Sequence, residues 1–481
     1  TESGGSTVST PHEPPASTVD AGTAPTADAA AADAAAPSAP GAQRIGNVRW
    51  GIAVLLFFGV LINYFDRTNI SVAAGPMGKE FGLTPGEVGI VLSSFLWSYT
   101  LAQIPAGLLL DKIGMKRVMR VTTWVWAVAC FLTAIASGTG LVILSRILLG
   151  LGEAAVFPGA MKVTGYWFPR AERGLSTAVF DSGQRLSNVI GTPLVAIAVV
   201  SLGWRGAFWT TGILSVVFAV VFWVAYRNPK EALRSGRLSQ AEHDYIRTGG
   251  AQDEDVAHPN PLANLGYVLR RRKVWGLALG LACAGYTTWL LLTWLPGYLQ
   301  TAMHLSVIKS GLFTAIPWLV AVVVEFLIPG WLVDHLIKRG REETVVRKSV
   351  LIAGMVIALG IVGAAFTTSV AVALFWITVG TVGITLAYCV SNSLPALIAP
   401  EGSVGAVASV MNFVNTLFGL SAPIVTGFLV QATGSFGPAF VVAGVIMAAG
   451  IFFYTVVLGP IEQIPAPEAA QAVQAATATA E

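Results

Sequence analysis

Long apolar runs occupy most of the sequence, and they limit the folds open to the chain. Of its 481 residues, 54% are hydrophobic and 11% are charged, whereas a soluble domain carries about 25% charged residues. A membrane-spanning helix needs about 20 mainly apolar residues, so the chain can supply twelve helices and still have loops and tails. We therefore expect an all-α polytopic membrane protein, and the composition argues against a water-soluble enzyme.

The apolar runs form two sets of six, which predicts two six-helix bundles. The helices are expected near 49–73, 85–110, 117–137, 140–165, 173–200 and 205–226, then near 274–301, 308–334, 344–367, 370–397, 402–430 and 436–459. We expect five segments, namely a disordered tail at 1–44, bundles at 45–226 and 274–459, a linker at 227–273 and a disordered tail at 460–481.

The distribution of basic residues predicts the orientation in the membrane. The chain has 29 Lys and Arg residues, and those in predicted loops fall almost entirely on the side of the central linker. The other side has Lys79, Arg205 and Lys309. Lys and Arg accumulate in cytoplasmic loops, so both termini and the linker are expected to be cytoplasmic.

An internal repeat supports two related halves. Gly107 and Asp111 stand four apart after the second predicted helix and precede a basic turn, and Gly330 and Asp334 repeat this spacing after the eighth. Residues four apart share one face of a helix. We expect each glycine to permit close helix approach and each aspartate to accept bonds from a neighbouring helix N-terminus or arginine.

Seven ionisable residues lie inside predicted helices, where each costs about 2.5 to 3.5 kcal/mol at the membrane centre. They are Asp66, Arg67, Arg146, Glu153, Asp181, Arg185 and Glu325. Such residues are functional candidates. By helix rise, Arg67 and Arg146 lie at similar depth in the outer half of the membrane, with Glu153 near the middle. Two guanidinium groups facing one cavity suit a carboxylate ligand.

Structural explanations for these charges remain open. Asp66, Arg67, Arg146 and Glu153 could neutralise one another, although neighbouring helix positions point about 100° apart, so Asp66 and Arg67 should meet different surroundings. Asp181 and Arg185 are spaced to pair along one helix. Glu325 is either a second protonation site or a helix-packing group.

The sequence also indicates which residues could carry a coupled proton and which class of ligand is bound. No histidine falls at the centre of a predicted span, so a coupled proton must bind to a buried carboxylate. Asp66 and Glu153 are the candidates. Polar residues inside helices suggest a hydroxyl-rich ligand, although interhelical hydrogen bonding could explain each one. These residues are Tyr64, Tyr99, Gln184, Asn392, Asn412 and Asn415.

The three cysteines have no metal-ligand or disulfide spacing, and no basic, aromatic-rich stretch suits nucleic acid.

Several motifs resemble the major facilitator superfamily over about residues 49–459. The GLLLDKIGMKR turn after the second helix is similar to that superfamily's signature loop. NYFDRTN, RILLGLGEAAVFPG, FDSGQ, TWLPGYL and VMNF resemble its anion:cation symporter family, and bacterial galactonate- and glucarate-type proton symporters in particular. The linker sequence LSQAEHDYIRTGG is similar to theirs too.

The resemblance implies a rocker-switch transporter with proton-coupling carboxylates at Asp66 and Glu153. It implies substrate contacts at Tyr64, Arg67, Tyr99, Arg146, Gln184 and Asn412, to which we add Asn392, and conformational gating at Gly107, Asp111, Lys112, Arg117, Gly330 and Asp334. Ser391-Asn392, Asp181 and Arg185 depart from the family pattern. Arg185 would favour a dicarboxylate such as an aldarate, unless Asp181 cancels its charge.

We therefore expect a bacterial inner-membrane carrier, not an enzyme, that imports an organic carboxylate anion with protons. A sugar acid is the expected substrate, the bilayer and this small anion are the expected partners, and a monomer is the expected state. No cofactor or metal is expected. Anion exchange, sodium-coupled symport and carriage of aromatic or other small carboxylates stay open. A receptor or channel is disfavoured, because the linker has no room for a signalling domain and the charges form no continuous polar path.

Overall fold

The structure is a computed structural model that describes residues 46–169, 172–253, 265–325, 327–328, 333–400 and 404–465. Within these ranges every regular element is a helix, which confirms the all-α prediction. The described residues belong to one compact unit. The predicted tail at 1–44 and residues 466–481 lie outside the described residues.

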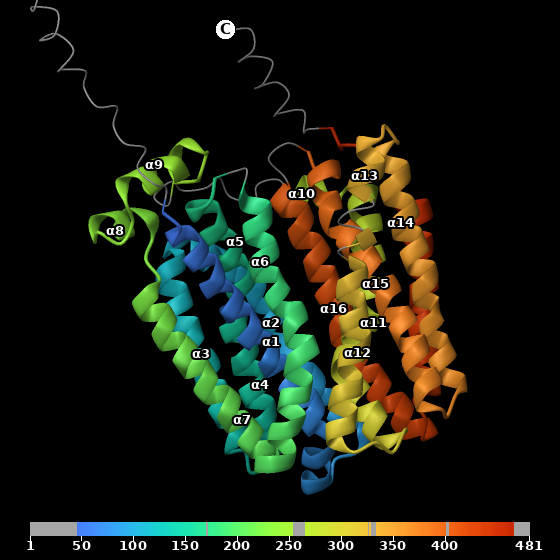
Figure 1. The fold of residues 1–481 in the computed structure, drawn as a ribbon. Coiled ribbons are helices and arrows are strands. Elements are labelled where there is room, and N and C mark those ends of the chain that lie inside the picture. Colours follow the sequence, from blue (N-terminus) through green and yellow to red (C-terminus); the bar gives the residue numbers. More distant parts are fainter. Residues whose placement is uncertain are drawn as a thin grey trace, which may run out of the picture. The chain divides into compact units, whose positions relative to one another are not determined.

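The helices are labelled in Figure 1. The first half contains α1 (Val48–Phe81), α2 (Pro85–Lys112), α3 (Met115–Ala134), α4 (Thr139–Glu153), α5 (Val156–Trp167), α6 (Arg173–Leu186), η2 (Ser187–Gly191) and α7 (Thr192–Ala225). The linker contains α8 (Pro229–Arg234), α9 (Gln240–Thr248) and α10 (Leu265–Leu269). The second half contains α11 (Arg272–Thr301), α12 (Val307–Glu325), α13 (Val333–Lys338), α14 (Glu343–Ala358), η4 (Leu359–Phe366), α15 (Val370–Ile398), α16 (Val404–Thr433), α17 (Gly437–Phe452) and η5 (Phe453–Val457).

Ten helical segments of the described chain are long and apolar enough to cross a membrane. One of them, Leu175–Ala225, has 51 residues and is interrupted at Gly203, whose φ of 74° breaks the helix. Helix α3 is not among the ten, and its first turns contain Lys116, Arg117 and Arg120. These ten segments support a multi-pass membrane protein, and the count of twelve crossings stays a prediction.

Local sequence signals explain where individual helices begin and end. Helix α1 ends at Gly82, which adopts a left-handed conformation with a φ of 65°. Helix α2 begins with a capping box, because the Thr84 side chain accepts a bond from the Glu87 backbone N–H and the Glu87 carboxylate accepts one from the Thr84 backbone N–H. Pro85 at the first helical position provides a backbone already suited to a helix.

The long helices run between two ends, which we call the linker end and the opposite end (Figure 1). The linker end carries the start of α1, the end of α2 and the linker helices. At the opposite end, α2 lies against α16, and a Cβ atom at Gly89 would be 2.4 Å from the Pro423 carbonyl oxygen. There α12 also approaches α7, where a Cβ at Gly311 would be 2.5 Å from the Ala196 Cβ. The two halves therefore pack closely at the opposite end.

The linker end differs, because two of its glycines face open space in this conformation. A Cβ atom at Gly107 would meet no atom within 4 Å, and the same holds at Gly405 near the start of α16. Gly107 therefore does not support close helix packing here, because α2 meets α16 near its other end. The repeated Gly330 and the side chains of Asp111 and Asp334 lie outside the described residues.

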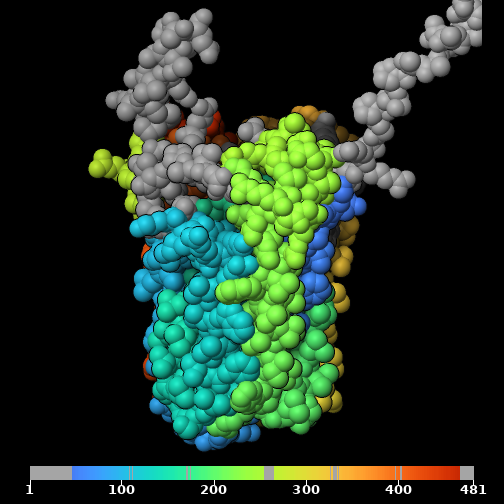
Figure 2. Space-filling view, turned by 90° about the vertical axis from the view of Figure 1, so that its left-hand side faces the viewer, coloured from blue at the N-terminus to red at the C-terminus, as the bar shows by residue number. Residues whose placement is uncertain are grey.

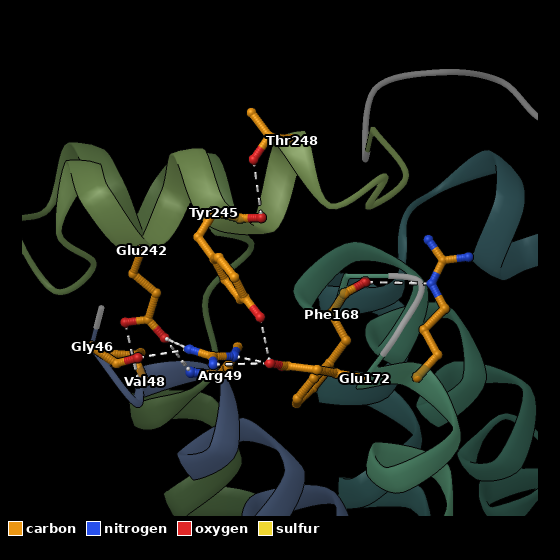
Figure 3. A network of polar contacts seen from close by, with 9 residues as sticks. Gly46, Val48, Arg49, Phe168, Glu172, Glu242, Tyr245 and Thr248 are labelled. Carbon is orange, nitrogen blue, oxygen red and sulfur yellow. Dashed lines mark hydrogen bonds and ion pairs between the residues drawn. The ribbon is translucent and has the colours of Figure 1, made fainter. Parts of the chain in front are cut away.

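The first part of the predicted linker is folded onto the first half. Glu242 of α9 accepts bonds from the backbone N–H groups of Val48 and Arg49 at the start of α1, and from Arg49 Nη1 at 3.1 Å. Arg49 also donates from Nε to Glu172 at 2.8 Å, and the Tyr245 hydroxyl donates to the same carboxylate (Figure 3). This network, which we call the linker clamp, joins α1, α6 and α9. It consists of Arg49, Glu172, Glu242 and Tyr245.

Other contacts fix the remaining linker and the chain after η5. Lys116 of α3 donates to Glu231 of α8 at 2.6 Å, and Figure 2 shows the yellow-green linker segment continuing from α7 over this end of the molecule. The backbone N–H of Ile464 donates to the Ile398 carbonyl oxygen at 2.9 Å. Residues 460–465 therefore differ from the predicted disordered tail, because two buried isoleucines, Ile461 and Ile464, anchor them.

Candidate functional site

A buried ion pair lies at the centre of the first half. Arg67 of α1 donates from Nε to Glu153 Oε2 at 2.8 Å, and the exposed fractions of the two side chains are 3% and 0%. Glu153 is the last residue of α4, which carries it to the same depth as Arg67. The Arg67 guanidinium also lies over the rings of Tyr64, Phe95 and Tyr99, at 4.4 to 4.9 Å from their centroids. Such cation–π contacts favour the cation in a buried site.

Arg146 lies beside this pair but has weaker partners. Its Nη1 donates to the Asp66 backbone carbonyl oxygen at 3.3 Å, and its guanidinium lies 5.2 Å from the Phe95 ring centroid. Its Nε has no hydrogen-bond partner within the described chain. Burying a charged group without full pairing is costly, so Arg146 retains capacity to bind an anion.

The Asp66 side chain is hydrogen-bonded to helices α3 and α7. Its Oδ2 accepts bonds from Trp126 Nε1 of α3 at 2.5 Å and from the Ser215 hydroxyl of α7 at 3.2 Å. Asp66 and Arg67 therefore have different surroundings, as their positions on the helix require. Asp66 Oδ1 and Glu153 Oε1 are buried and have no partner among the described residues. A proton on such an oxygen removes the cost of an unpaired buried anion.

A second charged cluster joins the two halves. Arg185 of α6 pairs with Asp181 one helical turn earlier at 2.8 Å, and its Nη2 donates to Glu325 Oε1 of α12. The Arg185 side chain is 32% exposed, against 3% for Arg67. The pairing along the helix agrees with one of the two alternatives for Asp181 and Arg185, but the contact with Glu325 was not predicted.

Comparison with known protein families identifies the family of this chain. Residues 56–423 match the model of the Major Facilitator Superfamily. The chain belongs to the major facilitator superfamily. This confirms the resemblance seen in the sequence motifs, and it makes the protein a membrane transporter, not an enzyme.

Relatives of this major facilitator protein extend over nearly its whole helical region. It is 42% identical to "Uncharacterized transporter YybO" of Bacillus subtilis, with 88% of this chain and 97% of the relative covered. It is 32% identical to the "D-galactonate transporter" of Escherichia coli, with 88% and 98% covered. These two relatives are bacterial transporters, and ten segments of the described chain could cross a membrane. The protein is therefore a bacterial-type, multi-pass protein of the inner membrane.

Solved structures agree on the fold. A bacterial homologue of the human lysosomal transporter Spinster, in an inward-facing and occupied conformation, superposes with a TM-score of 0.70 at 17% identity. The match covers 86% of this chain and 97% of that one. At this identity the similarity establishes the major facilitator fold alone.

The remaining predicted site residues of this major facilitator protein fall in four places. Tyr64 and Tyr99 contact Arg67 through their rings, so the structure brings them to the buried pair. Gln184 precedes Arg185 on α6 and is half-buried, while Asn392 on α15 is exposed. Asn412 of α16 donates to Gln103 Oε1 of α2 at 3.0 Å, across the two halves. Asn392, Asn412 and Gln184 thus do not contact Arg67 through any hydrogen bond in the described chain.

Sequence reasoning missed three partners that the fold provides. Phe95 lies under both arginines, Trp126 donates to Asp66, and Gln103 meets Asn412. An aromatic residue inside a membrane helix is too common to single out from sequence. Of the predicted gating residues, Lys112 and Arg117 are exposed at the linker end. The described chain contains no cluster of three or more His, Cys, Asp or Glu residues that could hold a metal ion.

Proposed function

We propose that this major facilitator transporter imports an organic carboxylate anion, a sugar acid above all, together with protons. The observation that carries this proposal is the buried Arg67–Glu153 pair, in which one carboxylate oxygen has a charged partner and the other has none among the described residues. A carboxylate in this position can be replaced by a ligand carboxylate once it is protonated. The galactonate transporter among the relatives supports the choice of a sugar acid.

The coupling step follows from the charges. While Glu153 is ionised, it occupies Arg67 at 2.8 Å and competes with any external anion. Protonation of Glu153 removes the negative charge and leaves Arg67, beside Arg146, free to bind a carboxylate through charged hydrogen bonds. Anion binding and proton binding therefore favour each other, which is the thermodynamic condition for symport. Asp66 binds the second proton on Oδ1, the oxygen that has no partner among the described residues, while Oδ2 keeps its bonds from Trp126 and Ser215.

The other predicted residues have supporting roles in this proposal. Tyr64 and Tyr99 keep the Arg67 guanidinium in place through their rings. Gln184, Asn392 and Asn412 supply donors and acceptors to substrate hydroxyl groups when the halves enclose the substrate. Lys112 and Arg117, with Gly107 and Asp111 and their counterparts Gly330 and Asp334, close the linker end in the opposite conformation.

The topology that suits this cycle has twelve crossings. Helix α3 supplies one crossing beyond the ten apolar segments, and the break at Gly203 divides the 51-residue segment into two. Two six-helix bundles then occupy 45–226 and 274–459, the linker end and both termini are cytoplasmic, and the protein acts as a monomer. Close packing at the opposite end, with open space around Gly107 and Gly405, corresponds to an inward-open carrier.

Uptake into proteoliposomes tests the function. Purified protein is reconstituted and supplied with labelled galactonate, glucarate, a hexuronate or an aromatic acid, with and without an inward proton gradient. Accumulation driven by the proton gradient supports the proposal and names the anion. Accumulation driven only by a sodium gradient, or exchange without net uptake, would replace proton symport with sodium coupling or with exchange.

A further inference from the structure

Arg185 is held by two carboxylates that lie on different halves of the protein. Asp181 binds it along α6 at 2.8 Å, and Glu325 binds it from α12. Among the described residues, the Cys389 thiol of α15 also interacts with Glu325. The cluster of Asp181, Arg185 and Glu325 has two negative charges and one positive charge, so its formal charge is one negative.

The cluster lies between the buried Arg67–Glu153 pair and the linker end. Helices α1 and α6 run side by side, because a Cβ at Gly183 would be 3.1 Å from the Leu61 backbone nitrogen. Arg185 is therefore near the level of Leu61, and Arg67 is about 9 Å further along α1 at 1.5 Å per residue. Two arginines thus follow one another along the axis of the protein, and each is paired with a glutamate.

Accessibility separates the two arginines. The Arg185 side chain is 32% exposed and that of Glu325 is 13% exposed, whereas Arg67 and Glu153 are almost fully buried. Because the Arg185–Glu325 contact crosses between the halves, a ligand located between them can replace Glu325 without unfolding either half. Asp181 belongs to the same helix as Arg185, so this exchange leaves it in place.

We propose that Arg185 is a second carboxylate-binding residue, which Glu325 occupies in this conformation, and that it selects organic dianions with a carboxylate at each end. This inference rests on the proposed function. One carboxylate of the dianion binds at Arg67 and Arg146, and the other replaces Glu325 on Arg185. Glu325 then takes up a proton from the solvent, so the two negative charges of the dianion are balanced by one proton on each of the two displaced glutamates, in addition to the proton on Asp66.

The test uses two ligands that differ in one group. Galactarate has a carboxylate at the carbon where galactonate has a hydroxymethyl group, and binding of both to purified protein is measured by calorimetry. We expect galactarate to bind more tightly to the unchanged protein. Arg185→Gln should weaken galactarate binding about 10-fold or more and change galactonate binding less than about 2-fold, since it removes a charged hydrogen bond to the second carboxylate.

Glu325→Gln gives the opposite expectation, although it breaks the same contact. The neutral amide competes less well for Arg185, so galactarate should bind at least as tightly as to the unchanged protein, and one proton fewer should enter with it. Glu87→Gln, in the exposed first turn of α2, removes a carboxylate at a distant position and is the matched control. If Arg185→Gln does not fold, Arg185→Lys provides a charged variant that loses the planar two-bond grip.

Three outcomes would overturn the inference. Equal changes in Arg185→Gln and Glu325→Gln would mean that the contact only holds the halves together. An equal loss of galactonate and galactarate binding in Arg185→Gln would mean that Arg185 does not recognise the second carboxylate. A protein that binds galactonate more tightly than galactarate would lack the selectivity. Absence of binding and uptake of every anion by the unchanged protein would instead overturn the proposed function, and this inference with it.

Discussion

Arg67 and Glu153 form a hydrogen-bonded ion pair of 2.8 Å between α1 and α4, with almost no exposed surface on either side chain. Breaking a buried pair by removing one partner costs about 3 to 5 kcal/mol, because the remaining charge is left uncompensated. A carrier that keeps such a pair at the centre of a membrane domain must regulate it. The two partners are therefore the most informative positions for mutation.

Glu153→Gln is expected to uncouple the carrier. The amide cannot carry the proton, yet it keeps the size of the side chain and leaves Arg67 able to bind an anion. Net uptake driven by a proton gradient should fall at least about 10-fold, whereas exchange against internal substrate should be better preserved. Unchanged gradient-driven uptake would contradict a coupling role for Glu153.

Arg146→Ala is expected to abolish both net uptake and exchange. Arg146 has no ion-pair partner within the described chain and its buried Nε is unpaired there, whereas Arg67 is paired with Glu153, so the loss of Arg146 removes the site guanidinium that is more available to a substrate carboxylate. We expect substrate affinity to fall about 10-fold or more. Binding measured on the purified, folded variant separates this effect from a folding defect. Binding equal to that of the unchanged protein would contradict a substrate-binding role for Arg146.

The linker clamp is expected to stabilise the first half. Glu242→Ala removes the acceptor for two backbone N–H groups at the start of α1 and for Arg49 Nη1. Because hydrogen bonds to charged groups contribute about 1.5 to 3 kcal/mol, we expect a loss of about 2 to 3 kcal/mol and a lower unfolding midpoint in detergent. Asp244→Asn, on the exposed face of the same helix, should have almost no effect.

The clamp also predicts a pH dependence. The Arg49 guanidinium, which donates two hydrogen bonds to Glu172, holds the pKa of that carboxyl below its ordinary value of 4.5. A carboxyl whose folded pKa is lowered stabilises the protein fully above its unfolded pKa, and this contribution is lost as the pH falls through the folded pKa. The unfolding midpoint should therefore decline below pH 4.5 through this group, and Glu172→Gln should reduce the decline.

Glu172→Gln should leave the shape of the profile unchanged between about pH 6 and 8, where the carboxyl is ionised in both states. The midpoint itself is expected to be lower throughout that range, because the amide pairs less strongly with Arg49. A variant with the same acid decline as the unchanged protein would show that other carboxyl groups set it.

Two glycines of α2 are expected to shift the conformational equilibrium in opposite directions. A Cβ at Gly89 would overlap the Pro423 carbonyl oxygen, so Gly89→Ala should destabilise the conformation closed at the opposite end. An overlap of about 1 to 3 kcal/mol changes the ratio of conformations about 5- to 150-fold. Gly107→Ala meets open space here, so it should favour this conformation by hindering closure at the linker end.

Thiol labelling measures that shift. In a Cys389→Ser background the other cysteines, Cys130 and Cys283, are buried. Cysteines introduced as Val88→Cys and Gly405→Cys then report the opposite end and the linker end. Gly89→Ala should increase labelling at position 88, whereas Gly107→Ala should preserve labelling at position 405. The same labelling pattern in both variants would contradict gating along α2.

Much of the fold was predictable, because a membrane helix is recognised from a continuous run of apolar residues. The apolar runs gave all the long helices to within several residues, although α1 extends to Phe81 where 73 was expected. The linker was not predictable in this way. Polar residues such as Glu242 and Tyr245 form a folded clamp through contacts with α1 and α6, which no local pattern records.

By itself, the sequence determined that this protein is an all-helical membrane transporter and which charged residues its helices carry, because apolar runs and buried charges are properties of single helices. Only the tertiary structure decided how those charges pair. Arg67 pairs with Glu153, which is 86 residues away in the sequence, and Arg185 pairs with Glu325, which is 140 residues away. The choice of partner depends on which helix faces pack together, and helix packing is decided by the fold as a whole.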